Sequence, residues 1–444
     1  MMTAPDRLLA VEAAGTTLLA GAGKSGIGIP ASVYPVDGFT AERDRLRARV
    51  VLLDDGTHRV ALAVVDLTSV FDELLDELKH LIGRTADVAE EDVVIAASHT
   101  FCAPHVFPTA RLNGEAAAKN EAVRQAVLAA VHRAAEDAVR QLRPARLGFG
   151  RGVCHANVNR NVLTADGWWL GADESGPCDR SVGVVRVDDT EGRPIALLIN
   201  YAVQSSVLHE SVTQDGGRLV SADLAGAATG HVERQYGEGT VALFLIGAAG
   251  DQAPYLTANR HTLDRDGARA RTDAHEAGHL LVDLLGERLG AEAARVGEGI
   301  RTTAPAEGTL AVIHTHVEVP AQVPPASLSD LRPTRDYPYR PNGTADAPVV
   351  VVRLGDIVLA GVQAELSSTS GLHVKENSPF PNTMVATMVD GAAKYMADAR
   401  DYDRITYGAM NSRYAKGAAE TVTAKILDTL NTVHNKPWQG GIRP

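Results

Sequence analysis

The chain has 444 residues, of which 45% are hydrophobic and 22% are charged, and its formal net charge is −12. This composition predicts a folded protein with a substantial core rather than a disordered chain. The negative charge argues against broad binding to nucleic acids or to anionic membrane surfaces, so we expect a small-molecule substrate and neither nucleic acid nor membrane as a partner.

Three further features bear on the cellular compartment. No apolar run approaches the ~20 residues of a membrane helix, and residues 1–21 lack the basic start and long apolar core of a signal peptide. The three cysteines, Cys102, Cys154 and Cys178, form no CxxC pair and predict no disulfide framework. We therefore expect a reduced, cytoplasmic protein.

The predicted elements alternate between strands and helices. Residues 21–38 are rich in Gly and Pro and predict an irregular loop, in which Gly21–Lys24 lacks the full spacing of a phosphate loop. Strands are predicted at residues 47–53, 59–67, 93–99, 145–152, 182–187, 194–203, 240–246, 310–320 and 347–359. Helices are predicted at residues 71–84, 115–142, 223–236, 264–289 and 417–434.

This alternation shows no compositional break, and it predicts the α/β class with mixed β-sheets flanked by helices. We expect a single catalytic domain over residues 1–444, with a Pro-rich surface excursion at about 320–348. Large α/β enzymes are often symmetric oligomers, so a homo-oligomer is compatible with this prediction.

Polar clusters follow several of the predicted buried strands. His99 ends the first of them, Gln204 follows the second with His209 close behind, Asp251 follows the third, and Glu365 follows a fourth. Loops at strand ends converge to build active sites in α/β folds. Imidazole and carboxylate groups, together with a phenol, would suit zinc with one position left for water.

The ordered series of these segments resembles the neutral/alkaline, non-lysosomal ceramidase family, with the features of a divergent bacterial member. The matching segments are, in chain order, Gly21–Ile27 for GxGxxxI, Ser98–Phe101 for SHTH, Asn157–Arg160 for NxNR, Pro194–Gln204 for PIxxxxNxAxH, Ser221–Gly226 for SADxxG, Gly247–Pro254 for GxxGDxxP, Ala364–Glu365 for GE, and Lys394–Tyr395 with Tyr407–Ala419 for the tyrosine segments. The resemblance implies the mixed α/β fold of that family's catalytic domain.

The resemblance also implies a zinc hydrolase whose metal is held by two histidines, a glutamate and a tyrosine. His99, Glu365 and Tyr395 stand at three of those four positions. The fourth holds Gln204, a poor zinc ligand that remains a possible metal or substrate contact. His209, one loop step further, is the alternative fourth ligand, so the expected metal set is His99, His209, Glu365 and Tyr395.

Two further departures from the family concern the reaction. Ala253 stands where ceramidases carry the serine of GDxSP, and Phe101 replaces the second histidine of SHTH. These departures point to hydrolysis of an amide or related bond in a small soluble substrate rather than in ceramide. Asp251 is expected as general base or ligand orienter, with the nearby His105 as a second catalytic candidate, and Arg160 is expected to bind substrate through its forked donors.

Two other interpretations remain open. The segment from His275 to His279 reads HExxH, which on a helix would place both histidines on one face with Glu276 beside them, as in zinc metallopeptidases. Alternatively, loss of the second histidine has remodelled the metal site, giving a non-hydrolytic, isomerase- or lyase-like relative or an inactive one.

Overall fold

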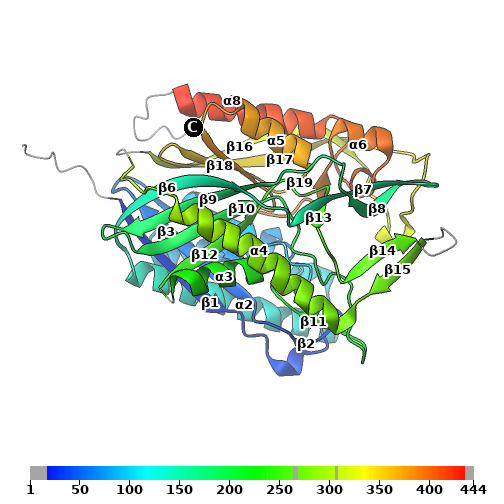
Figure 1. Ribbon diagram of the computed structural model, residues 1–444, viewed down its shortest axis with the longest axis horizontal. Coiled ribbons are helices and arrows are strands. Elements are labelled where there is room, and N and C mark those ends of the chain that lie inside the picture. Colours follow the sequence, from blue (N-terminus) through cyan, green and yellow to red (C-terminus); the bar gives the residue numbers. More distant parts are fainter. Residues whose placement is uncertain (1–17, 238, 264–268, 306–308, 436–444) are drawn as a thin grey trace, which may run out of the picture.

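The computed structural model describes residues 18–435 apart from 238, 264–268 and 306–308 (Figure 1). The strands are β1 (Leu19–Gly26), β2 (Phe39–Glu42), β3 (Arg47–Asp54), β4 (Arg59–Val65), β5 (Val93–Ala97), β6 (Arg143–Val153), β7 (Asn157–Thr164), β8 (Gly167–Asp173), β9 (Ser181–Asp189), β10 (Pro194–Tyr201), β11 (Arg218–Val220), β12 (Val241–Ile246), β13 (Gln252–Pro254), β14 (Asn259–Leu263), β15 (Arg269–Asp273), β16 (Leu310–Gln322), β17 (Pro341–Leu354), β18 (Ile357–Val362), β19 (Glu365–Leu366), β20 (Asn382–Ala386) and β21 (Tyr395–Met396). The helices are α1 (Asp72–Ala86), α2 (Gly114–Arg140), α3 (Asp223–Tyr236), α4 (Gly278–Glu298), α5 (Ser368–Asn377), α6 (Ala399–Arg404), α7 (Tyr407–Met410) and α8 (Ala418–Asn435).

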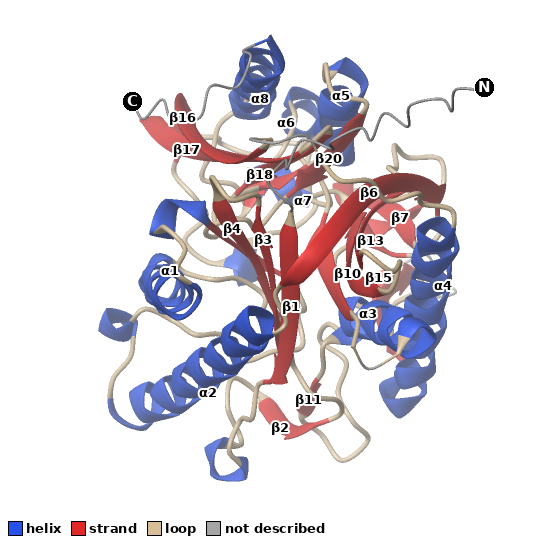
Figure 2. Ribbon diagram, turned by 90° about the vertical axis from the view of Figure 1, so that its left-hand side faces the viewer, coloured by secondary structure: helices blue, strands red, loops and turns tan. Residues whose placement is uncertain are grey.

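Two mixed sheets stack between two layers of helices (Figure 2). The larger sheet has eight strands in the order β12-β10-β9-β6-β1-β3-β4-β5, and the smaller has four in the order β16-β17-β18-β20. Helices α1 to α4 cover the outer face of the larger sheet, whereas α5 and α8 cover the outer face of the smaller one. The mixed α/β class predicted from the sequence is confirmed.

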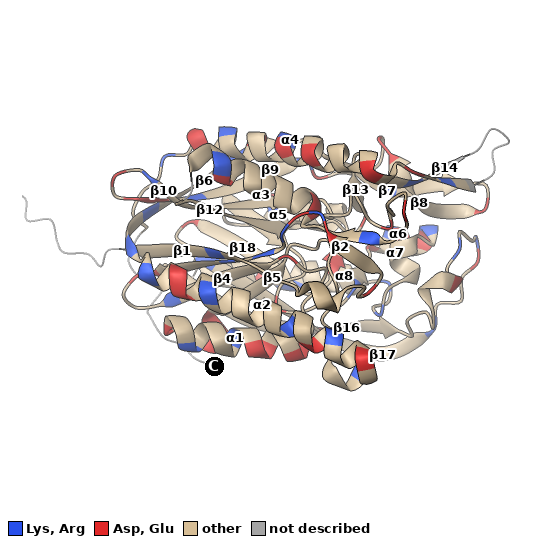
Figure 3. Cartoon of the chain, turned by 90° about the horizontal axis from the view of Figure 1, so that it is seen from below, with Lys and Arg blue, Asp and Glu red and all other residues tan. Residues whose placement is uncertain are grey.

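The alternation of side chains along β17 shows how the layers are held together. Val350 and Val352 point into the apolar layer between the two sheets, while Val349 and Val351 point toward α8. All four are at most 3% exposed, which is why this strand reads as a continuous apolar run rather than an alternating one. Charged residues of both signs lie along the outward-facing helices α1, α2 and α4 (Figure 3).

The hydrogen bonds of Asn200 connect the two sheets. Its side-chain amide, 1% exposed, donates to the carbonyl oxygens of Leu245 on β12 at 3.0 Å and of Val385 on β20 at 2.9 Å. Each hydrogen bond of a buried amide is costly to leave unmade, so this side chain fixes the relative position of the two sheets near their site-bearing ends.

The predicted loop at residues 21–38 is wrong in its first part, because residues 19–26 form β1 in the interior of the larger sheet. The glycines that suggested a loop serve close packing instead. A Cβ atom on Gly21 or Gly23 would lie 2.1 Å from a backbone oxygen of α2, that of Ala138 or Ala134. Glycine inside a strand can mark such an approach of another backbone.

The predicted helix at residues 264–289 is also wrong in its first half. Residues 269–273 form β15, which pairs with β14, and only a 3-10 turn at His275–Ala277 separates this hairpin from α4; residues 264–268 lie outside the described part. The predicted Pro-rich surface excursion at about 320–348 corresponds to a connection between β16 and β17. This connection is shorter than predicted, since β16 runs to Gln322 and β17 starts at Pro341. In the part of the chain that the structure describes, no helix is both long and apolar enough to cross a membrane.

The packing of β1 against α2 yields a stability prediction. In an open strand, replacing Gly by Ala would stabilise the fold by about 0.5–1 kcal/mol. In Gly23→Ala the new methyl meets the Ala134 carbonyl at 2.1 Å, so we expect destabilisation of about 1–3 kcal/mol in urea unfolding. Gly28→Ala is the control, because its Cβ would have a normal 3.5 Å contact with Arg45. Equal stability of the two variants would refute the close-packing role of Gly23.

Candidate active site

His99 lies at the end of β5, in a strained and well-fixed position. The strand ends at Ala97, and His99 has a backbone φ of +59°, which residues with a side chain rarely adopt. The imidazole is 3% exposed and its Nδ1 lies 2.6 Å from the carbonyl oxygen of Thr68. A carbonyl accepts only from a protonated Nδ1, so this contact leaves Nε2 as the nitrogen with a lone pair.

Glu365 brings a carboxylate to that lone pair. Its Oε2 is 3.2 Å from His99 Nε2, and yet Nε2 makes no hydrogen bond within the described part of the chain. Two electron-pair donors therefore converge in a buried space, an arrangement that a proton or a metal cation would relieve. Burial alone would raise the pKa of the Glu365 carboxyl, but the positive charge and hydrogen-bond donors around it, Arg160 and Gln204 among them, hold it below its usual range.

The backbone around Glu365 explains its position. β19 pairs in parallel with β21, so that Glu365 stands directly opposite Tyr395. On its other side the Gly250 amide donates to the carbonyl of Leu366 at 2.8 Å. A Cβ on Gly250 would lie 2.7 Å from the Glu365 carbonyl oxygen, so only glycine fits this approach.

Gln204 occupies the space beside Glu365. Its amide nitrogen donates to Glu365 Oε2 at 2.5 Å, and its oxygen accepts from Arg160 Nη1 at 3.0 Å. A hydrogen bond from Phe101 N to Ser205 O, 3.0 Å long, joins the loop after β5 to the loop after β10, and this brings Gln204 near His99. Both polar atoms of the amide are thus in use within the site.

Arg160 is a buried cation at the centre of the site. Its Nη2 donates to the carbonyl of Gly250 at 2.7 Å, and its guanidinium carbon lies 4.8 Å from the ring centre of Tyr395 and 5.7 Å from that of Tyr407. The Nε group of Arg160 has no hydrogen-bond partner among the described residues. Burial raises the pKa of Tyr395 to about 12, although Arg160 acts in the opposite direction.

Asp251 supports the site from behind. Its carboxylate accepts from the Ser368 amide at 2.7 Å, from the Ser368 hydroxyl at 2.9 Å and from Asn159 at 2.9 Å, and its carbonyl accepts from the Arg160 amide at 2.8 Å. Burial is the largest influence on the pKa of Asp251, which is raised. These contacts hold Asp251 in the framework behind Arg160, and its expected role as general base or ligand orienter stays a prediction.

In the described part of the chain, His209 is linked to His99 through Phe101. The ring centre of Phe101 lies 4.7 Å from that of His99 and 4.7 Å from that of His209, both in edge-on contacts. Partial desolvation lowers the pKa of His209, whose side chain is 43% exposed. The structure therefore assembles His99, Glu365 and Tyr395 but not His209, the fourth member of the expected metal set.

His105 is engaged elsewhere. Its Nδ1 lies 2.5 Å from Asp37 Oδ2 and its ring stacks on Phe107 with centres 5.1 Å apart. Among the described residues, these are its partners, and neither His99 nor Glu365 contacts it. The contacts of His105 thus do not place it within reach of the groups around Arg160.

The HExxH segment does not lie on one helix. His275 sits in the 3-10 turn with a φ of +49°, and its Nδ1 is 2.8 Å from the Val212 carbonyl, while His279 belongs to α4. Glu276 accepts from the Gln214 amide at 2.9 Å. Within the described residues, no group of three or more His, Cys, Asp or Glu side chains could hold a metal ion, here or around His99, where the third group is a tyrosine.

Some members of the site gave no sequence signal. Thr68 acts through its backbone carbonyl, which any residue type carries, and Ser368 lies just beyond β19 in an unremarkable serine-rich stretch. The sequence marked Tyr407 only as the first residue of a segment that resembles the family, and it predicted no function for this tyrosine. Its ring lies 6.0 Å from that of Tyr395 and 5.6 Å from that of Trp169, so it forms part of an aromatic wall.

Comparison with known proteins shows which folds and which family this chain resembles. Among solved structures, the chain is similar to neutral ceramidase from Pseudomonas aeruginosa, with a TM-score of 0.70, 18% identity and coverage of 97% of this chain and 76% of that one. A ceramidase complexed with C2 gives a TM-score of 0.73, 18% identity, and 97% and 77% coverage. These likenesses concern the fold.

A search of the curated proteins found no match. The model of the neutral/alkaline non-lysosomal ceramidase N-terminal region, in contrast, matches residues 39–276, which is 238 of the 444 residues. The chain therefore belongs to the neutral/alkaline, non-lysosomal ceramidase family of hydrolases.

Proposed function

We propose that this protein is a zinc-dependent hydrolase that cleaves an amide or related bond in a small soluble substrate. The observation that carries the proposal is the convergence of His99 Nε2 and Glu365 Oε2, 3.2 Å apart, with Nε2 lacking a hydrogen bond in the described structure. The Thr68 carbonyl selects the tautomer that a histidine needs in order to bind a metal through Nε2.

The donor set suits zinc. His99 supplies a neutral imidazole nitrogen and Glu365 an ionised oxygen, and Tyr395 stands opposite Glu365 in the β19–β21 pair. When bound, zinc would act as a Lewis acid toward the scissile carbonyl. The phenol of Tyr395 keeps its proton at neutral pH in the absence of a further positive charge, since its pKa is raised to about 12.

Arg160 is our candidate for holding the substrate. Two of its nitrogens are fixed by Gln204 and Gly250, which sets the plane of the guanidinium, and its Nε–H remains a buried donor without a partner. A preorganised cation of this kind binds a substrate oxygen and stabilises negative charge that develops on it. Asp251 acts indirectly, because it accepts from Asn159 and from the backbone amide of Arg160 and so fixes this end of β7.

The substrate class follows from the departures of this chain from its family. Ala253, on β13 opposite Val158 of β7, carries only a methyl group where ceramidases carry a serine. A methyl group can neither attack nor orient a carbonyl. The serine hydroxyl that ceramidases use for cleavage is therefore missing from this chain. We therefore favour a small amide or a related compound that Arg160 and the aromatic residues Tyr395 and Tyr407 can hold.

One specific observation favours a remodelled, non-hydrolytic or inactive site as the second candidate. Gln204 is bonded to Glu365 and to Arg160 at the same time, so it ties the expected metal ligand to the expected substrate-binding group. A site closed by this bridge would bind zinc weakly or hold a substrate without cleaving it.

The first test of the proposal measures metal content. We expect purified protein to contain about one zinc per chain, and His99→Ala to lose it, because His99 supplies the only imidazole nitrogen that contacts Glu365 among the described residues. His275→Ala removes a histidine of the HExxH segment and serves as the matched control that keeps zinc. Zinc retained by His99→Ala and lost by His275→Ala would establish the peptidase interpretation instead, and absence of zinc from all three proteins would favour the remodelled site.

The second test identifies the fourth ligand. Gln204→His restores a histidine beside Glu365, and we expect it to bind zinc at least about tenfold more tightly in competition with a chelator. His209→Ala should leave the zinc affinity unchanged, since Phe101 stands between this histidine and His99. A loss of zinc in His209→Ala would show that the loop after β10 rearranges and that His209 is the ligand.

The third test concerns the substrate. Assays with short N-acyl amides in solution and with ceramide in detergent micelles should show hydrolysis of the former alone. Arg160→Gln, which keeps hydrogen-bonding capacity without the charge, should lower kcat/KM for the amide by about 10²-fold. Cleavage of ceramide at a rate equal to that of the small amides would refute the assignment of a soluble substrate.

A further inference from the structure

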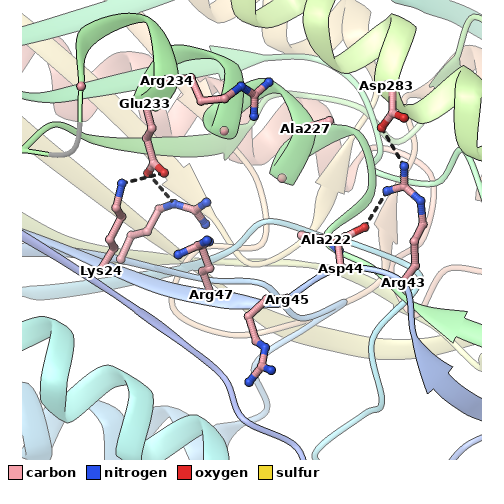
Figure 4. A pocket seen from close by; sticks show the side chains of 14 residues that line it. Lys24, Arg43, Asp44, Arg45, Arg47, Ala222, Ala227, Glu233, Arg234 and Asp283 are labelled. Carbon is pink, nitrogen blue, oxygen red and sulfur yellow. Dashed lines mark hydrogen bonds and ion pairs between the residues drawn. The ribbon is translucent and has the colours of Figure 1, made fainter.

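A cavity lies between the larger sheet and α3, built from residues other than those of the site around His99 (Figure 4). Its volume is about 730 Å³, within the range of small-molecule binding pockets. It is lined by Lys24, Arg43, Asp44, Arg45, Arg47, Arg49, Ala222, Gly226, Ala227, Gly230, Glu233, Arg234, Gly237 and Asp283. Six of these fourteen residues are cationic and three are anionic, in a chain whose net charge is −12.

Small residues on α3 keep this cavity open. Gly226, Ala227 and Gly230 face it, and a Cβ on Gly230 would touch only the terminal nitrogen of Arg234, at 3.3 Å. The opposite side is formed by β1 and β3 and by the segment between β2 and β3, which carry the long basic side chains. Lys24 belongs to the strand β1, so the Gly21–Lys24 segment is not a phosphate loop, although its lysine faces this cavity.

Four of the six cations are neutralised by carboxylates. Lys24 pairs with Glu233 at 2.8 Å, and Arg45 pairs with Glu42 at 2.8 Å. Arg43 lies between Asp44 and Asp283, at 2.6 and 2.7 Å, and Arg49 lies between Asp66 and Glu233, at 3.2 and 3.4 Å. The pairs of Arg49 are buried in the wall of the cavity, since this residue is 2% exposed.

The remaining two cations, Arg47 and Arg234, have no carboxylate partner among the described residues. Arg47, on β3, is half-buried, and Arg234, on α3, is exposed. Figure 4 shows the two guanidinium groups on opposite sides of the cavity, with Arg234 on the helix side. Guanidinium groups bind phosphate oxygens through paired hydrogen bonds, and two of them facing one space can hold a multiply charged anion.

We propose that this cavity binds a small, polar phosphorylated compound, held between Arg47 and Arg234. The lining residues include no aromatic side chain on which a nucleobase could stack, so a sugar phosphate or a pyrophosphate-like group fits better than a nucleotide. The cavity shares no residue with the site around His99, so its ligand would bind apart from the substrate of that site.

Calorimetric titration with inorganic pyrophosphate at low ionic strength tests the proposal. We expect saturable binding by the purified protein, and binding weaker by about 10- to 100-fold in the double variant Arg47→Gln/Arg234→Gln. The control, Arg146→Gln/Arg332→Gln, removes the same charge from two exposed arginines outside the cavity and should bind as the parent does. His99 and Glu365 are present in all three proteins, so any chelation of a bound metal by pyrophosphate contributes equally.

A third variant tests the cavity itself. Gly230→Leu places a bulky side chain beside the Arg234 guanidinium while it retains every cation, and it should weaken binding without lowering the thermal unfolding temperature. No binding of pyrophosphate by the parent protein, equal binding by the arginine variant, or equal affinity of the parent for sulfate or citrate would each overturn the proposal.

Discussion

The active site depends on the way in which two sheets are held face to face. His99 is carried by β5 at the edge of the larger sheet, whereas Glu365 follows β18 of the smaller sheet. The apolar layer between the sheets and the hydrogen bond from Asn200 to Val385 join the two sheets, and the backbone hydrogen bonds Ala97 N to Met388 O and Val389 N to Val362 O connect β5 and β18 to the same segment. A shift of about 1 Å between the sheets would separate His99 Nε2 from Glu365 and remove the site.

Gly250 and Asp251 bring the loop after β12 close to Glu365 and to β7. Gly250 lets the loop after β12 approach the backbone of Glu365, and Asp251 then joins β7 to the start of α5 through Asn159 and Ser368. The fixed Arg160 side chain is a consequence of this framework rather than a local preference of its own strand. The Asp251 carboxylate can be buried next to the site because it accepts three hydrogen bonds, which offset the cost of removing it from water.

The sequence predicted the parts whose signals are local. The buried strands that end near His99, Gln204 and Asp251 are recognisable as apolar runs, and the resemblance to a family supplied Glu365 and Tyr395. Two failures have a common cause, because β1 and the β14–β15 hairpin depend on tertiary contacts that no periodicity shows. Glycine in β1 resembles loop glycine in sequence, and only the backbone of α2 distinguishes the two. The contact of His209 with Phe101 rather than with His99 is likewise a tertiary feature without a sequence signal.

The exchange of a histidine for Gln204 changes the electrostatics of the site as well as its ligand count. A histidine at this position would leave the Glu365 carboxylate facing Arg160 and the metal, whereas the amide donates to Glu365 and accepts from Arg160. Glutamine therefore joins the anion and the cation through one neutral bridge and satisfies both without a metal. Because the pKa of Glu365 is held low, the carboxylate stays ionised at neutral pH and remains able to bind a cation. The Gln204 amide thus occupies Oε2 of Glu365, while His99 Nε2 has no hydrogen bond in the described structure. Under the proposed function, the balance between this one hydrogen bond and a bound metal cation would distinguish an active hydrolase from a remodelled relative.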